Sequence, residues 1–127
     1  MRRSIADMMA MLQELELSMP QMGTLFFLKA AGTQSVSAIA KHLGLSLAAT
    51  SHLVERLVGR DLVVRQEDPS DRRQKRVTLS ASGLGLIAKA DARATASLES
   101  MLEGVPPALF AALEHALNDV VDVLELD

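Results

Sequence analysis

The chain has 127 residues, which suits one domain, or one domain with additional helices for association, and is too short for two independent enzymatic lobes. Hydrophobic residues make up 49% and charged residues 23%, as in ordinary globular domains, so we expect a packed core. The absence of cysteine excludes disulfides, thiolate nucleophiles and Cys-ligated metal sites. The net charge of −3, taken alone, argues against a polyanionic partner.

The charges are unevenly distributed along the chain. Residues 38–80 contain eight Lys or Arg against five acidic residues, whereas residues 81–127 contain two against eight. A basic middle segment and an acidic C-terminal segment predict that the two parts of the chain have different functions. Asp7 interrupts the apolar start, and no uncharged run reaches the roughly 18 residues of a spanning helix, so we expect a cytoplasmic protein without membrane contact.

The first 32 residues predict two helices. Apolar residues recur at steps of three and four from Ile5 to Leu15, which is the spacing of a helix with one apolar stripe. Ser18 then offers a capping oxygen, Pro20 suits a first helical turn and Gly32 provides a stop, so a second helix is expected between them.

Two further helices follow across a tight turn. Ser37 is the expected N-cap of a short helix that ends at Gly44, where a left-handed C-cap is needed. Ser46 is the expected N-cap of the next helix, which ends near Gly59. Two helices joined by a turn that contains glycine form a helix-turn-helix. The apolar stripe predicted for the second of them contains Leu47, Thr50, Leu53, Val54, Leu57 and Val58.

A β-hairpin is predicted directly after this helix pair. Strand-like runs at 62–65 and 77–79 flank the polar stretch QEDPSDRRQKR, which is expected to form a long basic loop. An Ala-rich helix then begins at Ser80 or Ser82, and a last helix begins at about Pro107. The predicted fold is mainly α with a small β-hairpin wing, namely a winged helix-turn-helix flanked by terminal helices.

This arrangement suits double-stranded DNA. The major groove admits one α-helix, and the narrower minor groove admits an extended loop or an Arg side chain. Because the apolar stripe must face the core, the outward face of the second helix is expected to present Ser46, Ala48, Ala49, Ser51, His52 and Glu55, with Arg56 close by. In the wing the candidate DNA contacts are Asp71, Arg72, Arg73, Lys75 and Arg76. Either Arg72 or Arg73 is expected to enter the minor groove, with Asp71 orienting a guanidinium by a charge-assisted hydrogen bond.

The stretch LGLSLAATSHLVERLVGRDLVVR and the wing DPSDRRQKRVTLSASG resemble the multiple antibiotic resistance regulator (MarR) family of bacterial transcription factors. The wing pattern Asp68-Pro69-x-Asp71-Arg72-Arg73 and the following Arg76-Val77-x-Leu79-Ser80 carry the resemblance, together with the helix order from end to end.

The resemblance implies a homodimer that binds a pseudo-palindromic operator, usually as a repressor, and that is released by a small apolar or phenolic effector. On this basis residues 1–127 form a single domain. Residues 18–80 are its winged helix-turn-helix lobe, and residues 1–17 and 81–127 form a helical dimerisation region. Such a regulator acts in the bacterial cytoplasm, associated with the nucleoid when it is bound to DNA.

Other interpretations are left open by the residues themselves. The apolar stripes of the terminal helices suit either a dimer interface or a monomer core. A winged-helix adaptor that binds a protein through the outward helix face is the alternative function, although an adaptor does not need a basic wing. An enzyme is disfavoured because the sequence has no activated nucleophile and no Gly-rich phosphate loop. No metal ion or cofactor is expected, since the three histidines lack metal-motif spacing.

Overall fold

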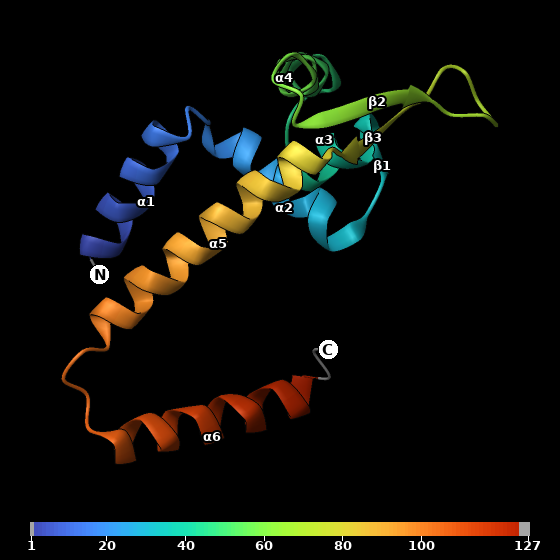
Figure 1. Cartoon of the computed structure of the whole chain (residues 1–127). Coiled ribbons are helices and arrows are strands. Elements are labelled where there is room, and N and C mark those ends of the chain that lie inside the picture. The colour runs from blue at the N-terminus through green and yellow to red at the C-terminus, as the bar shows by residue number, and fades with distance from the viewer. Residues whose placement is uncertain (1, 125–127) are drawn as a thin grey trace. The chain divides into compact units, whose positions relative to one another are not determined.

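The structure is a computed structural model that describes the backbone of residues 2–124 and the side chains of residues 5–124. Its helices are α1 (Arg2–Glu14), α2 (Met19–Ala31), α3 (Val36–Leu43), α4 (Leu47–Gly59), α5 (Ala81–Met101) and α6 (Pro107–Leu124). Its strands are β1 (Gln34–Ser35), β2 (Val63–Glu67) and β3 (Lys75–Leu79). The predicted fold, mainly helical with a small β-hairpin wing, is confirmed (Figure 1).

The chain divides into two compact units, residues 1–95 and residues 96–127. The first unit contains α1 to α4, the sheet and most of α5, and it holds the buried core. The second unit contains the end of α5 and α6, and α6 buries none of its residues. The candidate DNA-contacting residues therefore all belong to the first unit.

The ends of the helices are fixed by short-range hydrogen bonds. At the start of α2, the Ser18 hydroxyl accepts the Gln21 amide while the Gln21 side chain accepts the Ser18 amide, which is a complete capping box. Gly44 ends α3 with φ of 67°, and Ser46 caps α4, as predicted. The predicted cap of α3, Ser37, is wrong, because the Ser35 hydroxyl accepts the Ala38 amide at 3.0 Å and α3 already begins at Val36.

The sheet has three antiparallel strands in the order β1-β3-β2. Strand β1 was not predicted from the sequence, because two residues are too few to show alternation. It pairs Gln34 with Val77 and Ser35 with Arg76. The hairpin strands are also longer than predicted, and β2 and β3 pair from Val63–Leu79 out to Glu67–Lys75. The loop is therefore confined to residues 68–74, and Lys75 and Arg76 lie on β3.

One core holds α4, the hairpin and the start of α5 in a common frame. Leu25, Ile39, Val54, Leu57, Val77 and Ile87 are all essentially inaccessible to solvent. The start of α5 lies close to the chain before β2, since a Cβ at Gly83 would overlap the carbonyl oxygen of Leu62. Ser80 begins α5, because its hydroxyl accepts the Gly83 amide at 3.0 Å. This frame fixes the position of the wing relative to α4.

Candidate nucleic-acid interface

Helix α4 has one buried face and one exposed face. Thr50, Leu53, Val54 and Leu57 are buried, and the Thr50 hydroxyl donates to the Ser46 carbonyl at 2.8 Å. The apolar stripe is thus confirmed from Thr50 onward, whereas the assignment of Leu47 to it is wrong, because that side chain is 57% exposed. Among the candidate DNA contacts on this helix, Ser51 is half-buried, and Ser46, Ala48, Ala49, His52, Glu55 and Arg56 are exposed.

A shallow open groove runs between α4 and the start of α2, with a volume of about 270 Å³. It brings together three of the candidate residues, Ala49, His52 and Arg56. The remaining lining residues are Ser18, Pro20, Gln21, Leu45 and Leu53. Two nitrogen-bearing side chains, His52 and Arg56, therefore lie on one side of α4 and can both donate to a single neighbouring anion.

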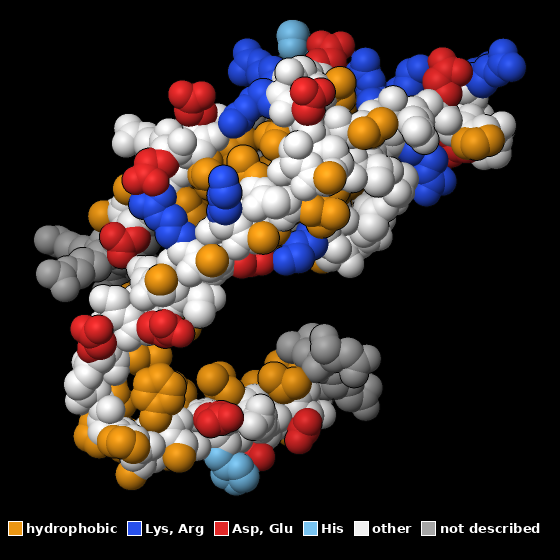
Figure 2. All heavy atoms as spheres, in the orientation of Figure 1, with side chains coloured by type: hydrophobic (Ala, Val, Ile, Leu, Met, Phe, Trp, Pro, Cys, Tyr) orange, Lys and Arg blue, Asp and Glu red, His pale blue; other side chains and the backbone are white. Residues whose placement is uncertain are grey.

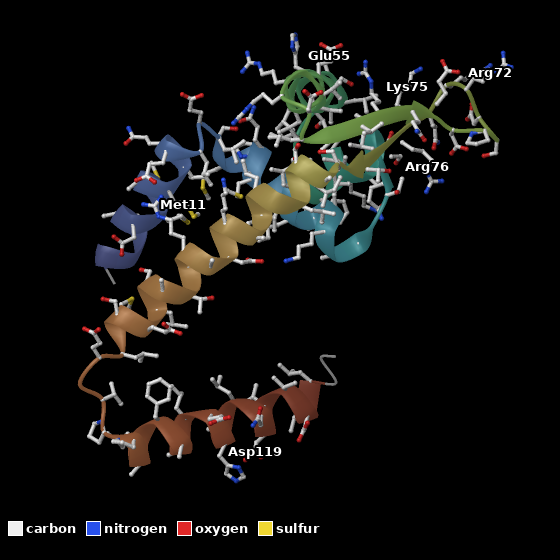
Figure 3. The ribbon with its side chains drawn as sticks, in the orientation of Figure 1. Met11, Glu55, Arg72, Lys75, Arg76 and Asp119 are labelled. Atoms are coloured by element: carbon white, nitrogen blue, oxygen red, sulfur yellow. The ribbon has the colours of Figure 1, made fainter. Side chains whose placement is uncertain are left out.

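The wing projects from the sheet beyond the core. Figure 3 shows Arg72 at the outer end of the hairpin, with Lys75 and Arg76 closer to the sheet. The tip residues Asp71, Arg72 and Arg73 are exposed. Lys and Arg side chains gather along the hairpin and around α4 (Figure 2), although the whole chain carries a net negative charge. The two predicted contact elements thus share one basic region.

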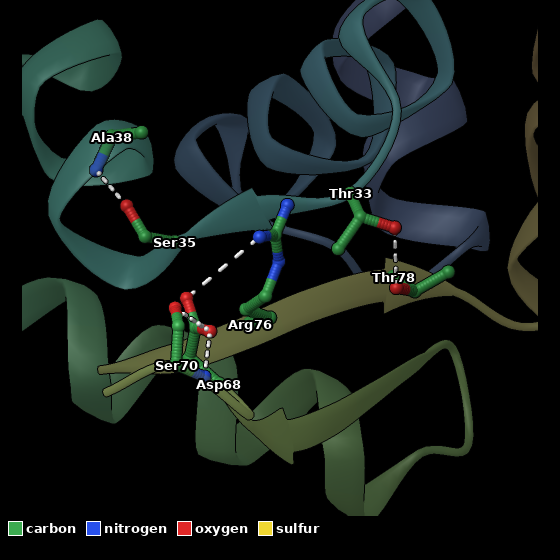
Figure 4. Close-up of polar contacts among 7 residues, drawn as sticks. All are labelled: Thr33, Ser35, Ala38, Asp68, Ser70, Arg76 and Thr78. Atoms are coloured by element: carbon green, nitrogen blue, oxygen red, sulfur yellow. Dashed lines mark hydrogen bonds and ion pairs between the residues drawn. The ribbon is translucent and has the colours of Figure 1, made fainter. Parts of the chain in front are cut away.

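Acidic side chains shape the loop of the wing. The Asp68 carboxylate accepts the amide and the hydroxyl of Ser70, at 2.9 and 2.7 Å, and lies 3.7 Å from the Arg76 guanidinium (Figure 4). The hydrogen bonds from Ser70, with a smaller contribution from Arg76, hold the pKa of Asp68 below its usual range. Asp71 accepts the backbone amide of Arg73 at 3.0 Å and no guanidinium within the described wing. Its predicted role of orienting an arginine is therefore replaced by shaping the backbone of the loop.

The basic residues of the wing differ in their partners. Lys75 pairs with Glu67 at 2.9 Å, and Arg76 pairs with Asp68. By contrast, the guanidinium groups of Arg72 and Arg73 have no ion-pair partner among residues 5–124. Exposed ion pairs are weak, so Lys75 and Arg76 can exchange partners, but within this loop the two tip arginines already present their full charge to a ligand.

Several residues that support the interface were missed from the sequence. Glu67 ends β2, where the hairpin register places it opposite Lys75, and Asp68 begins the loop and pairs with Arg76. Arg65 of β2, which was also missed, lies 3.9 Å from the candidate residue Glu55 of α4 and so links the wing to the helix. The Arg60 guanidinium donates to the carbonyls of Leu15 and Glu16, which ties the end of α4 to the end of α1. Only the Glu67–Lys75 pair could have been predicted from the sequence, because the two residues carry opposite charges on the two arms of the hairpin.

The part of the chain that the structure describes offers no metal centre beside this interface. No cluster of three or more His, Asp or Glu side chains in that part could hold a metal ion. Within the same range, every helix is too short or too polar to cross a membrane.

Known proteins of similar sequence and fold identify the family. A model of the MarR family matches residues 17–75. YfiV of Bacillus subtilis, an uncharacterized HTH-type transcriptional regulator, is 35% identical over 112 residues, which cover 88% of this chain and 70% of that protein.

Two solved structures show the same fold. The transcriptional regulator Tm0710 from Thermotoga maritima superposes with a TM-score of 0.82 at 21% identity, covering 90% of this chain and 80% of that one. BpsR of Bordetella bronchiseptica, whose DNA binding is regulated by 6-hydroxynicotinic acid, has a TM-score of 0.64 at 27% identity, covering 95% and 86%. The winged helix, the sequence match and these structures agree, and the chain belongs to the MarR family of transcriptional regulators.

Proposed function

We propose that this chain is a homodimeric, sequence-specific DNA-binding repressor without enzymatic activity. The observation that carries the proposal is the common frame of α4 and the wing, in which the exposed face of one helix lies beside a hairpin with two exposed arginines at its tip. In this proposal α4 enters the major groove, and Arg72 or Arg73 reaches the adjacent minor groove. The operator is a pseudo-palindrome, and the protein acts in the bacterial cytoplasm, associated with the nucleoid.

The individual roles follow from the exposed chemistry of the interface. Ser51 and His52 donate to bases or phosphates, and Arg56 to phosphate, from the outward side of α4. Arg72, Arg73, Lys75 and Arg76 neutralise phosphates along the wing. The proposed contact set is Ser46, Ala48, Ala49, Ser51, His52, Glu55, Arg56, Asp71, Arg72, Arg73, Lys75 and Arg76.

The homodimer is supported by exposed apolar surface at both ends of the chain. Ile5, Met8 and Met9 of α1 are exposed, and α6 carries exposed Leu, Val and Phe side chains along its length. Most of the stability of a helix in a protein comes from packing of its apolar face, so α6, which buries none of its 18 residues, needs a partner surface. We propose residues 1–17 and 81–127 as the dimerisation region and residues 18–80 as the DNA-binding lobe.

We propose that a small apolar or phenolic effector releases the repressor from DNA. The support is the relative BpsR, in which 6-hydroxynicotinic acid regulates DNA binding. Adding 6-hydroxynicotinic acid or a simple phenol to the protein–DNA complex is expected to lower the affinity for DNA.

The function is tested by fluorescence anisotropy with a labelled duplex from upstream of the coding region and a shuffled duplex of the same composition. We expect tighter binding to the upstream duplex and loss of affinity in a variant with Arg72→Gln and Arg73→Gln. Absence of binding to any duplex at low salt would instead favour an adaptor that binds a protein through the exposed face of α4.

A further inference from the structure

Leu47 is the first residue of α4, and its side chain lies outside the buried stripe of that helix. Its side chain is 57% exposed, although it is followed one turn later by the fully buried Thr50. The buried stripe of α4 therefore begins after Leu47, and the core does not need this side chain. Leu47 is therefore available for contact with a partner, on a helix that otherwise presents small or polar side chains outward.

The surroundings of Leu47 indicate the chemistry of its partner. Residues 44–51 carry no charge, and Leu45, Ala48 and Ala49 are also exposed. The next turns of α4 carry His52 and Arg56, and the tip of the wing adds two exposed arginines. An uncharged, apolar helix end inside a basic region fits a polyanion that presents small apolar groups between its charges.

Double-stranded DNA has this chemistry in its major groove. Thymine is the only standard base that displays a methyl group there, and apolar side chains read it by contact. In helix-turn-helix proteins the N-terminal residues of the recognition helix contact the base edges. Residues 46–55 of this helix also include no Asn, Gln or Lys, so few side chains there can distinguish bases by hydrogen bonds.

We propose that Leu47 is a specificity-determining residue that packs against the 5-methyl group of one thymine in each half-site. This inference rests on the proposed DNA-binding function and adds the base that one side chain reads. Burial of a methyl group contributes about 0.8 kcal/mol, which corresponds to a change in affinity of about four-fold.

The test uses the full-length protein and a duplex selected by it from a random-sequence library. Each thymidine of the selected site is replaced, one at a time, by deoxyuridine, which removes only the 5-methyl group. For the wild-type protein we expect one thymidine per half-site at which the replacement weakens binding by about four-fold. For Leu47→Ala we expect equal Kd values with thymidine and deoxyuridine at that position.

The control variant is Val64→Ala, which removes another exposed apolar side chain from the same lobe. Because side chains alternate along a strand, Val64 faces away from buried Val63, and its variant should retain the wild-type response to deoxyuridine. Circular dichroism melts verify that both variants fold.

Any one of the following results would overturn the inference. If deoxyuridine does not weaken binding of the wild-type protein at any position, readout of a thymine methyl group is excluded. If Leu47→Ala responds to deoxyuridine as the wild type does, the methyl group is read by another residue. A change in oligomeric state in Leu47→Ala without a change in that response would make Leu47 a protein contact. Failure to select any duplex would remove the proposed DNA-binding function itself, and it would appear before any deoxyuridine is introduced.

Discussion

Arg73 and His52 represent two kinds of DNA contact within the proposed interface. Arg73 extends from the tip of the wing without an ion-pair partner in the described structure, whereas His52 is exposed on α4. Arg73→Ala is expected to weaken binding to all sequences and to reduce the salt slope by about one, because one phosphate is no longer neutralised, while His52→Ala changes the preference among sequences. Titrations of cognate and random duplexes check both. Equal losses of affinity on the two duplexes for His52→Ala would remove His52 from the base-reading residues.

Asp68 makes the stability of the wing depend on pH. Its pKa is lowered in the folded protein, first by Ser70 and then by Arg76, so its contribution is present above the ordinary carboxyl value of about 3.9. That contribution is lost as the pH falls through the lowered pKa. The melting temperatures of wild type and Asp68→Asn, measured between about pH 6 and pH 2.5, should therefore differ most near pH 6 and converge near pH 2.5. The pKa of Glu14, lowered by Arg93, affects both proteins equally. A difference that grows with acidity would contradict the assignment.

Among the helices and strands, Gly83 fixes how closely α5 approaches the chain before β2. A Cβ there would overlap the Leu62 carbonyl oxygen and lie 3.1 Å from a Leu79 methyl carbon. Gly83→Ala is expected to lower the free energy of unfolding by about 2–3 kcal/mol, because backbone must shift. Gly85→Ala is the matched control, since its Cβ meets nothing within 4 Å and replacing a helical glycine gains about 0.5–1 kcal/mol. Urea unfolding measures both, and equal effects would refute the close approach.

The sequence predicts these elements well where a local signal exists. Ser18, Gly44 and Ser46 are caps whose function depends on neighbours within four residues, and all three are confirmed. The failures have non-local causes. Strand β1 exists only because β3 offers it a partner, and Ser35 caps α3 because Val36 is already helical and buried.

The candidate site is predictable to a smaller extent. Periodicity correctly separates the buried and exposed faces of α4 from Thr50 onward, but it cannot tell that the buried stripe begins only after Leu47. The roles of Asp68 and Asp71 depend on the path of the loop, which pairs carboxylates with backbone amides and with Arg76. Residue order alone gives the charges of the wing and leaves their partners undetermined.

For the assembled protein, the exposed apolar stripe of α6 leads to a prediction about association. Leu113 and Leu117 lie one turn apart, are 46% and 55% exposed, and belong to a helix without a buried residue. Leu117→Glu is expected to shift the protein from dimer to monomer in sedimentation velocity, because it introduces a charge into the proposed interface. His115→Glu is the control, since His115 is exposed on another side of the helix and pairs with Asp119. A dimer that persists in Leu117→Glu would place the interface elsewhere.

In the proposed complex, two winged lobes of one dimer neutralise DNA phosphates together, and the salt dependence of binding is the decisive measurement. If each lobe contacts roughly three to four phosphates, the plot of log affinity against log salt concentration should have a slope of about −5 to −7. We predict this slope for the upstream duplex, at a stoichiometry of two chains per duplex. A slope near zero, or a stoichiometry of one chain per duplex, would rule out the paired-lobe complex.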